Sequence, residues 1–145
     1  IVTIQNPYSL LNRTYEINMA EIAEMENIKL LAYSPLGFGV LTGKYINNKP
    51  KDSRLSLWNR FNRYSNKNSK DSTLKYVELA KKYNITPTQL ALSFVNQQPF
   101  VTSNIIGATN LSQLNENIKS IDLILDEEII SEIESIHLSQ PNPAP

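Results

Sequence analysis

Three polar side chains fall on one stripe of a predicted helix and could together hold a single polar ligand. The stretch NIIGATNLSQLNENI, residues 104–118, changes from a strand-like pattern to a helical pattern at Leu111. In a helix, Gln113, Glu116 and Asn117 occupy positions i, i+3 and i+4, so their side chains lie close together. Amide and carboxylate groups offer both hydrogen-bond donors and acceptors. The stripe is therefore a candidate binding site.

A purely local explanation of the same residues stays open. Asn110 is a suitable N-cap residue, and Gln113 stands at the N3 position of a possible capping box. In that case these side chains would satisfy the free backbone donors of the helix, and no ligand would be needed. The apolar residues of the helix form a separate stripe that we expect to face a core: Leu111, Leu114, Ile118 and Ile121.

Glycines gather at two places that could approach a phosphate closely. Gly37, Gly39 and Gly43 lie in SPLGFGVLTGKY, directly after a predicted strand, and Gly107 follows another strand. Glycine allows the backbone to come near an anion, and Lys44 adds a positive charge. The segment GVLTGKY lacks the spacing of a P-loop. Each glycine taken singly could also serve only a turn.

The elements that would position these groups alternate between strand and helix. Strands are predicted at Ile1–Gln5, Lys29–Tyr33 and Phe100–Ile106. Helices are predicted at Tyr15–Met25, Leu74–Tyr83, from Pro87, from Leu111 and at Asp126–His137. The third of these has the clearest start, with Thr86 as N-cap, Pro87 at N1 and Gln89 at N3.

Two segments are predicted without regular structure of their own. Residues Tyr45–Ser72 are rich in Asn, Lys and Ser, so we expect a long loop with a short helical piece near Leu57–Tyr64. The final PNPAP cannot be helical. In the first helix, the expected apolar side consists of Ile17, Ala20, Ile22 and Ala23.

Composition excludes several classes of function. Fourteen basic and fourteen acidic residues give a net charge of zero, which argues against binding to a nucleic-acid backbone. The chain has no cysteine and a single histidine, His137, so neither a thiolate zinc site nor a histidine metal cluster is expected. No apolar run approaches the roughly 20 residues of a membrane span. We expect a cytoplasmic protein without a membrane or nucleic-acid partner.

Alternating strands and helices predict an α/β fold with a parallel sheet covered by helices. A doubly wound sheet is the rival, but its G-x-G-x-x-G fingerprint is absent. Three strands are too few to close a barrel, so half of a (β/α)₈ TIM barrel is the favoured interpretation. The chain opens on IVTIQNPYS, without an initiator methionine, and we expect it to be a fragment of a longer protein.

Three ordered motifs, QNPYSLLNR, LLAYSPLGFGVLTGKY and IIGATNLSQLNENI, resemble the C-terminal half of an aldo-keto reductase. The resemblance is strongest to the Tas-type and potassium-channel β-subunit-like branch and covers residues 1–145. It implies a (β/α)₈ barrel to which this chain contributes strands 6–8, with the N-terminal half of the same barrel as its partner. It also implies that the full protein binds NADPH and reduces aldehydes or ketones, its small-molecule carbonyl substrates.

The same resemblance implies a role for each cofactor-binding position. Gln5 would hold the nicotinamide carboxamide, and Tyr33 would stack on the nicotinamide ring. The pyrophosphate would be lined by Ser34, Pro35, Leu36, Lys44 and Arg54. The adenosine would meet Gly107, Thr109 and Gln113 at the ribose and 2′-phosphate, and Glu116 and Asn117 at the adenine. One departure is Gln113, where the aldose-reductase branch usually has an arginine.

No catalytic residue can be assigned in this chain. By the resemblance, the catalytic Asp, Tyr, Lys and His belong to the N-terminal half of the barrel, and Tyr8 and His137 lie in the wrong segments for those roles. We therefore expect the fragment alone to be inactive. An NADPH-binding regulatory or auxiliary subunit with little catalytic activity is the alternative function, and the upstream residues would discriminate between the two.

Overall fold

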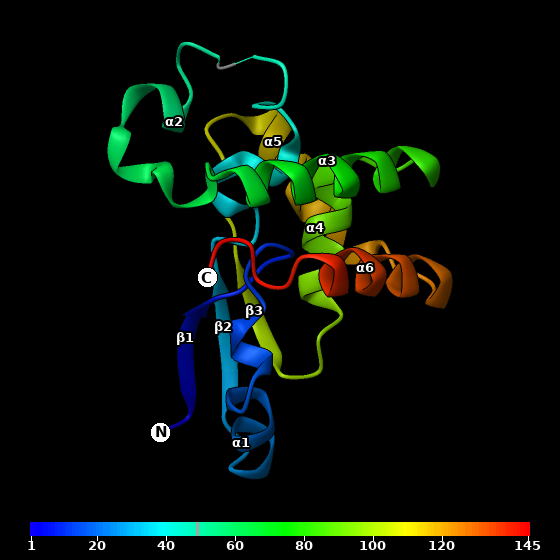
Figure 1. Ribbon diagram of the computed structural model, residues 1–145. Coiled ribbons are helices and arrows are strands. Elements are labelled where there is room, and N and C mark those ends of the chain that lie inside the picture. The colour runs from blue at the N-terminus through cyan, green and yellow to red at the C-terminus, as the bar shows by residue number, and fades with distance from the viewer. Residues whose placement is uncertain (49) are drawn as a thin grey trace.

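The structure is a computed structural model that describes residues 1–48 and 50–145. Its sheet contains three parallel strands in the order β1 (Thr3–Pro7), β2 (Lys29–Tyr33) and β3 (Val101–Ile105). The strands run upward in Figure 1, so their carboxyl ends meet at the edge nearest α2 and α5. The predicted parallel sheet is confirmed, and β2 has its predicted bounds. The first strand lies two residues later than predicted.

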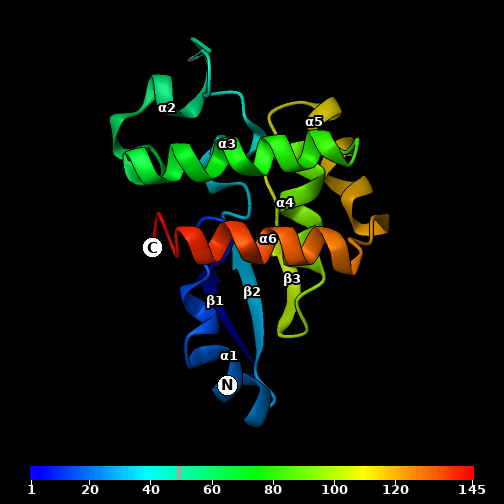
Figure 2. The same ribbon diagram turned by 45° about the vertical axis from the view of Figure 1, so that its right-hand side comes forward.

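The two faces of the sheet differ in burial. Leu30 and Ala32 of β2 are fully buried on the face that packs against the helices. Because side chains alternate along a strand and paired residues of parallel strands share a face, Gln5, Leu31 and Tyr33 lie on the other face. That face is partly open, and Gln5 is exposed there. In Figure 2, α6 crosses in front of the sheet, with α3 running beside α6.

The first predicted helix is divided in two. A single 3₁₀ turn, Thr14–Glu16, precedes α1 (Met19–Met25), and Asn18 between them has a φ of 74°. Asparagine tolerates this left-handed conformation, but a continuous helix does not contain it. The expected apolar side is also only partly right, because Ala23 is buried whereas Ile17 and Ile22 are largely exposed.

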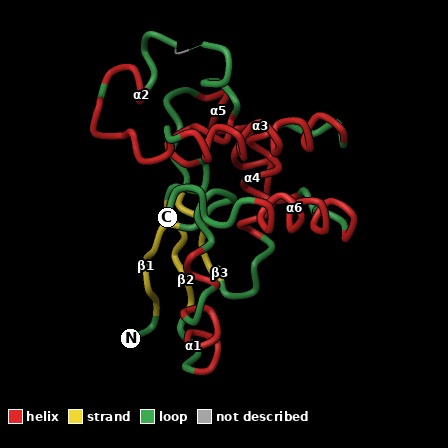
Figure 3. Tube along the Cα trace, viewed as in Figure 1, coloured by secondary structure: helices red, strands yellow, loops and turns green. Residues whose placement is uncertain are grey.

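The segment predicted as a long loop is helical in its second half. It contains α2 (Arg54–Leu57), a 3₁₀ segment at Asn59–Tyr64 and the start of α3 (Lys67–Lys82), and Figure 3 shows helical colour through most of this part. Lys49, within the predicted loop, lies outside the described residues. The start of α3 was placed too late because its buried side at Ser69, Ser72 and Thr73 carries small hydroxyl residues, which show no apolar period.

The best-signalled helix is α4 (Pro87–Asn96), and its predicted capping box is present. The Thr86 hydroxyl accepts a hydrogen bond from the Gln89 backbone N–H at 3.1 Å, and the Gln89 side chain accepts one from the Thr86 N–H at 2.9 Å. Its residues from Leu90 to Val95 are all buried. This helix is therefore the fixed centre of the helical layer.

The last two helices are α5 (Leu111–Lys119) and α6 (Glu127–Ser139). In α6, Ile129 and Ile133 are buried as the period predicts. The expectation for α5 is wrong, since its apolar stripe is exposed: Leu111, Leu114, Ile118 and Ile121. Periodicity identifies an apolar face correctly, but it does not reveal whether the chain itself supplies a covering surface.

Residues 141–145 are not helical, as predicted, and they tie distant segments together. The Asn142 side chain accepts a hydrogen bond from the Arg13 N–H at 2.6 Å, and the Ala144 N–H donates to the Leu11 carbonyl at 3.1 Å. The Pro143 carbonyl accepts hydrogen bonds from Asn66 and Ser69 at the start of α3. This segment therefore fixes α3 against the loop that follows β1.

Candidate functional site

A pocket of about 870 Å³ lies beyond the carboxyl ends of β2 and β3. Its volume is in the range typical of small-molecule and cofactor sites, which often form at this edge of a parallel sheet. Its walls come from the loop after β2, α2, the first residues of α4, and α5. Eleven of the twelve residues predicted to bind a cofactor line it: Tyr33, Ser34, Pro35, Leu36, Lys44, Arg54, Gly107, Thr109, Gln113, Glu116 and Asn117.

The remaining predicted residue, Gln5, does not line this pocket. It lies on β1 opposite Leu31, on the same sheet face as Tyr33 and one side-chain level further from the carboxyl end. The structure therefore places Gln5 and Tyr33 on one open surface but does not join Gln5 to the other predicted residues.

The loop after β2 turns sharply because several of its residues, among them Ser34 and Gly39, have positive φ angles. Ser34 has a φ of 57°, and its carbonyl accepts a hydrogen bond from the Gly37 N–H at 2.9 Å. Gly39 has a φ of 88°, and a Cβ added there would come within 3.1 Å of the Lys44 ammonium. Glycine at this position thus leaves room for Lys44 to lie against the loop, and the Lys44 ammonium lies 5.1 Å from the centre of the Tyr45 ring.

Arg54 stands at the start of α2, on the opposite wall from α5. Its guanidinium carbon lies 5.7 Å from the centre of the Phe38 ring, so a cation–π contact holds it over the loop after β2. Lys44, Lys51 and Arg54 give this part of the pocket three basic side chains, against the acidic Asp52. The wall formed by α2 and the preceding residues is therefore suited to an anion.

The start of α5 shows how the two interpretations of its polar residues combine. The Asn110 side chain caps the helix by accepting a hydrogen bond from the Gln113 N–H at 2.9 Å. The reciprocal contact of a capping box does not form, because the Gln113 side-chain oxygen accepts from the N–H and hydroxyl of Thr109, both at 3.0 Å. Capping by Asn110 is thus confirmed, and the Gln113 amide group still faces the pocket wall.

The other two residues of the stripe are held by neighbouring segments. The Asn117 side chain is 5% exposed, and its Nδ2 donates to the Gly107 carbonyl at 3.3 Å. Glu116 Oε1 accepts a hydrogen bond from the Thr86 hydroxyl at 2.6 Å. These contacts join β3, α4 and α5 at one end of the pocket.

Several lining residues were not identified from the sequence. They are Phe38, Thr42, Pro50, Lys51, Asp52, Ser53, Thr86, Pro87, Thr88, Ile105, Ile106 and Ala108. Gly39, one of the glycines predicted to approach a phosphate, also lines the pocket. Thr86 and Pro87 had been recognised only as a helix start. The signal that could have found them is that a helix N-terminus is itself suited to an anion, but only the tertiary structure shows that this one lies at the pocket.

Tyr8 has no access to a ligand. It is fully buried, and its hydroxyl donates to Glu16 Oε1 at 2.5 Å. Burial, followed by the negative charge of Glu16, raises the pKa of Tyr8 far above its ordinary value. Arg13 binds both Glu16 carboxylate oxygens, at 2.6 and 2.7 Å, and Glu134 at 2.7 Å. This cluster joins the loop after β1 to α6.

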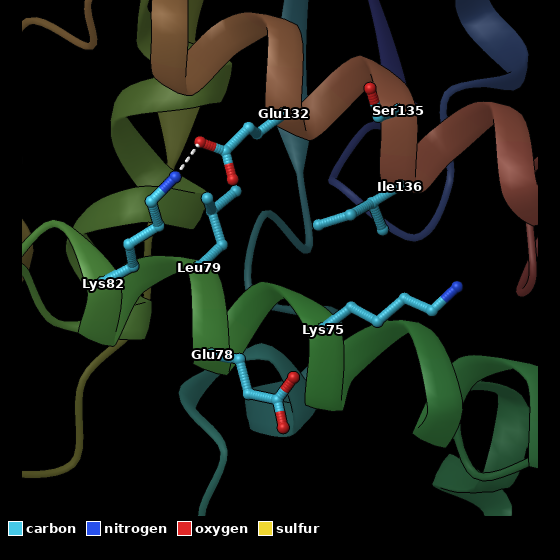
Figure 4. A pocket seen from close by; sticks show the side chains of 7 residues that line it. All are labelled: Lys75, Glu78, Leu79, Lys82, Glu132, Ser135 and Ile136. Atoms are coloured by element: carbon cyan, nitrogen blue, oxygen red, sulfur yellow. Dashed lines mark hydrogen bonds and ion pairs between the residues drawn. The ribbon is translucent and has the colours of Figure 1, made fainter.

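A second hollow, of about 310 Å³, lies on the surface between α3 and α6 (Figure 4). Lys82 and Glu132 face each other across it with 2.6 Å between Nζ and Oε1. The Tyr83 hydroxyl also donates to Glu132 at 2.5 Å, and this contact raises the pKa of Tyr83 to about 12. Lys82 and Glu132 thus bind each other across the hollow, and Lys75 donates to the Ser139 hydroxyl outside it at 2.9 Å.

Among residues 1–48 and 50–145, no three His, Asp or Glu side chains are placed to hold a metal ion. Within the same residues, no helix is long and apolar enough to cross a membrane.

A model of the Aldo/keto reductase family matches residues 1–138, which is nearly the whole chain. The chain belongs to this family. Over its full length it is 50% identical to Protein tas of Escherichia coli, of which it covers 42%. It is 35% identical over 94% of its length to a probable voltage-gated potassium channel subunit beta of Oryza sativa subsp. japonica, of which it covers 44%. The predicted resemblance to these two branches is confirmed.

A solved structure confirms the fold class. The chain superposes with a TM-score of 0.74 and 28% identity on a glycerol dehydrogenase from Gluconobacter oxydans, covering 99% of this chain and 44% of that one. The fold is therefore part of a (β/α)₈ barrel. It spans less than half the length of the relatives that it matches.

Proposed function

We propose that this chain supplies most of the cofactor site of an NADPH-dependent oxidoreductase that reduces aldehydes or ketones to alcohols. The supporting observation is one continuous pocket that joins the basic loop after β2 to the polar stripe of α5. An extended dinucleotide has its phosphates between two ring systems. The basic loop would meet the phosphates, and the polar stripe of α5 would meet one of the ring systems. The amide, carboxylate and basic side chains that line the pocket also fit the donor and acceptor pattern of the dinucleotide.

The pyrophosphate would lie in the central part of the pocket. Ser34 and Leu36 offer backbone groups after β2, with Pro35 between them, and Ser34 also offers a hydroxyl. Lys44 and Arg54 supply positive charge at the same loop. Charge-assisted hydrogen bonds to phosphate are roughly twice as strong as neutral ones. Phosphate binding would therefore hold α2 against the loop after β2.

The adenosine would lie along α5. Gly107 and Thr109 would meet the ribose, and Gln113 with the N-terminus of α5 would meet the 2′-phosphate. Glu116 and Asn117 would hold the adenine, for which a carboxylate and an amide offer complementary hydrogen bonds. Because Gln113 is neutral, much of the preference for NADPH over NADH would come from the N-terminus of α5, since the pyrophosphate that Lys44 and Arg54 would bind is common to both cofactors.

The nicotinamide would lie on the open sheet face, where Tyr33 offers a flat ring and Gln5 offers an amide to the carboxamide group. NADPH bound there would supply the hydride for carbonyl reduction. Tyr33 would cover one side of the nicotinamide ring, so that only the other side faces the carbonyl substrate. The group that protonates the carbonyl oxygen would come from the N-terminal half of the barrel.

We further propose that residues 1–145 form the C-terminal part of a single barrel domain. Both outer strands, β1 and β3, pair on one side only within the described residues, and both outer helices, α1 and α5, expose apolar side chains. Strands and helices from the N-terminal half would cover these surfaces. The intact mass of the natural protein tests this directly, because a mass of 16.5 kDa would contradict it.

A chimera provides the test of cofactor binding. In it, this chain replaces the segment of Escherichia coli Protein tas that it matches at 50% identity, which restores a full barrel around it. NADPH and NADH are titrated by fluorescence or calorimetry, and we expect tighter binding of NADPH. Equal dissociation constants for the two cofactors would contradict the proposed preference.

Replacing Arg54 with Ala in the chimera should weaken the binding of both NADPH and NADH, because the pyrophosphate is common to the two cofactors. Loss of one charge-assisted contact costs about 1.5–3 kcal/mol, which corresponds to roughly a tenfold or greater rise in the dissociation constant. Arg63→Ala is the matched control, because Arg63 is exposed outside the pocket and donates to the Pro145 carbonyl. An equal effect of both variants would show that Arg54 does not contact the cofactor.

A regulatory or auxiliary NADPH-binding subunit is the second candidate function, favoured by the 35% identity to a protein named as a probable channel β subunit. In that case cofactor occupancy would change the affinity for a protein partner, and carbonyl turnover would be negligible. Single-turnover oxidation of bound NADPH by an aldehyde, measured on the natural full-length protein, discriminates between the two. Rapid oxidation supports the enzyme, and its absence supports the subunit.

A further inference from the structure

We infer that Thr86 is a positioning residue that makes this site select adenine over a 6-oxo purine. The inference rests on the proposed function, because it concerns how Glu116 would recognise the adenine of a bound dinucleotide. Thr86 stands at the start of α4, whereas Glu116 belongs to α5. None of the sequence motifs assigned to the cofactor includes Thr86.

The Thr86 hydroxyl makes two contacts at once. It donates to Glu116 Oε1 at 2.6 Å and accepts from the Gln89 backbone N–H at 3.1 Å as the N-cap of α4. A hydroxyl has one hydrogen to donate and two lone pairs to accept, so both contacts can exist together. The capping contact orients the hydroxyl, and its hydrogen then remains for Glu116.

The two helices differ in how firmly they are held. In α4 the residues from Leu90 to Val95 are all buried, whereas in α5 Asn117 is the buried residue and the rest are exposed or half-buried. The side chain of a glutamate on such a helix has several rotatable bonds. If the ligand itself must order this side chain, the loss of conformational entropy weakens ligand binding. The bond from Thr86 attaches Glu116 to the fixed helix before any ligand binds.

The consequence for recognition follows from hydrogen-bond chemistry. With Oε1 engaged by Thr86, Glu116 Oε2 remains to accept a hydrogen bond from the ligand. The 6-amino group of adenine can donate that hydrogen bond. The 6-oxo group of hypoxanthine can only accept one, so two acceptor oxygens would face each other and no hydrogen bond would form between them. Both Thr86 and Glu116 line the pocket, so this contact lies where the ligand would bind.

The test compares NADPH with its deaminated analogue, in which hypoxanthine replaces adenine, as ligands of the tas chimera. The unsubstituted chimera should bind NADPH about tenfold or more tightly than the analogue. Thr86→Asp keeps a good N-cap but cannot donate to Glu116, so it should reduce the ratio of the two dissociation constants to about two or less. Because both ligands carry the same charge, any general repulsion by the new carboxylate cancels in this ratio.

Two further variants separate positioning from helix stability. Thr86→Ser keeps both contacts and should keep the full ratio of the two dissociation constants. Gln89→Ala weakens the capping box without removing the donor to Glu116, so it should keep the same ratio. A full ratio in Thr86→Asp, or a lost ratio in Thr86→Ser, would overturn the inference. If the unsubstituted chimera binds both ligands equally, the inference fails while the proposed function stands. If it does not bind NADPH, the proposed function itself fails.

Discussion

Residues 1–145 expressed alone should not form a stable, active monomer. Large apolar side chains on α1, on α5 and on the 3₁₀ turn after α5 remain exposed: Ile22 by 50%, Met25 by 76%, Leu111 by 76%, Ile118 by 54% and Ile121 by 64%. Full burial of such a side chain is worth about 1.5–3 kcal/mol, so each has roughly 1–2 kcal/mol still to gain. For the five together this is roughly 5–10 kcal/mol, which is comparable with the roughly 5–15 kcal/mol that stabilises a whole domain.

The assay compares the isolated chain with the tas chimera. Sedimentation measures the state of association, urea unfolding measures cooperativity, and oxidation of NADPH by a generic aldehyde measures turnover. We expect the isolated chain to aggregate or unfold without a sharp transition, because β1 and β3 also present open edges. Supplying the missing part of the barrel in trans should restore cooperative unfolding and NADPH binding. A monomeric isolated chain that unfolds cooperatively and turns over substrate would refute the reasoning.

Three further predictions concern the chimera. Arg13→Ala should lower the free energy of unfolding by about 1–3 kcal/mol, measured by urea titration, because it removes the buried guanidinium that binds the half-exposed carboxylates of Glu16 and Glu134. Gly39→Ala should weaken NADPH binding several-fold in fluorescence titration, because φ is 88° there and the new Cβ would displace the Lys44 ammonium. Burial lowers the pKa of His137 below its ordinary value of 6.5, so the unfolded state takes up the proton at a higher pH than the folded state. The free energy of unfolding should therefore fall as the pH drops through about 6.5. His137→Gln should reduce this pH dependence of the unfolding midpoint.

Local physical rules explain which elements could be predicted. The capping box at Thr86 and Gln89 acts within four residues, and proline ends β2 after Tyr33 and Ser34, so neither depends on distant parts of the chain. The start of α3 could not be predicted in this way, because the buried Ser69 hydroxyl binds the distant Pro143 carbonyl and gives no apolar period. Packing against another segment decides such positions, and a periodic pattern does not contain that information.

The order of strands and helices, the family motifs and the residue types of the candidate site can be read from the sequence. That Arg54 lies over Phe38, that Thr86 binds Glu116, and that Gln5 stands outside the pocket is visible only in the folded chain. Residue type and helical or strand period act over a few neighbouring positions and do not contain these contacts. The meeting of α2, α4 and α5 is fixed instead by the parallel sheet, which brings the carboxyl ends of β2 and β3 to one edge although they are far apart in the chain.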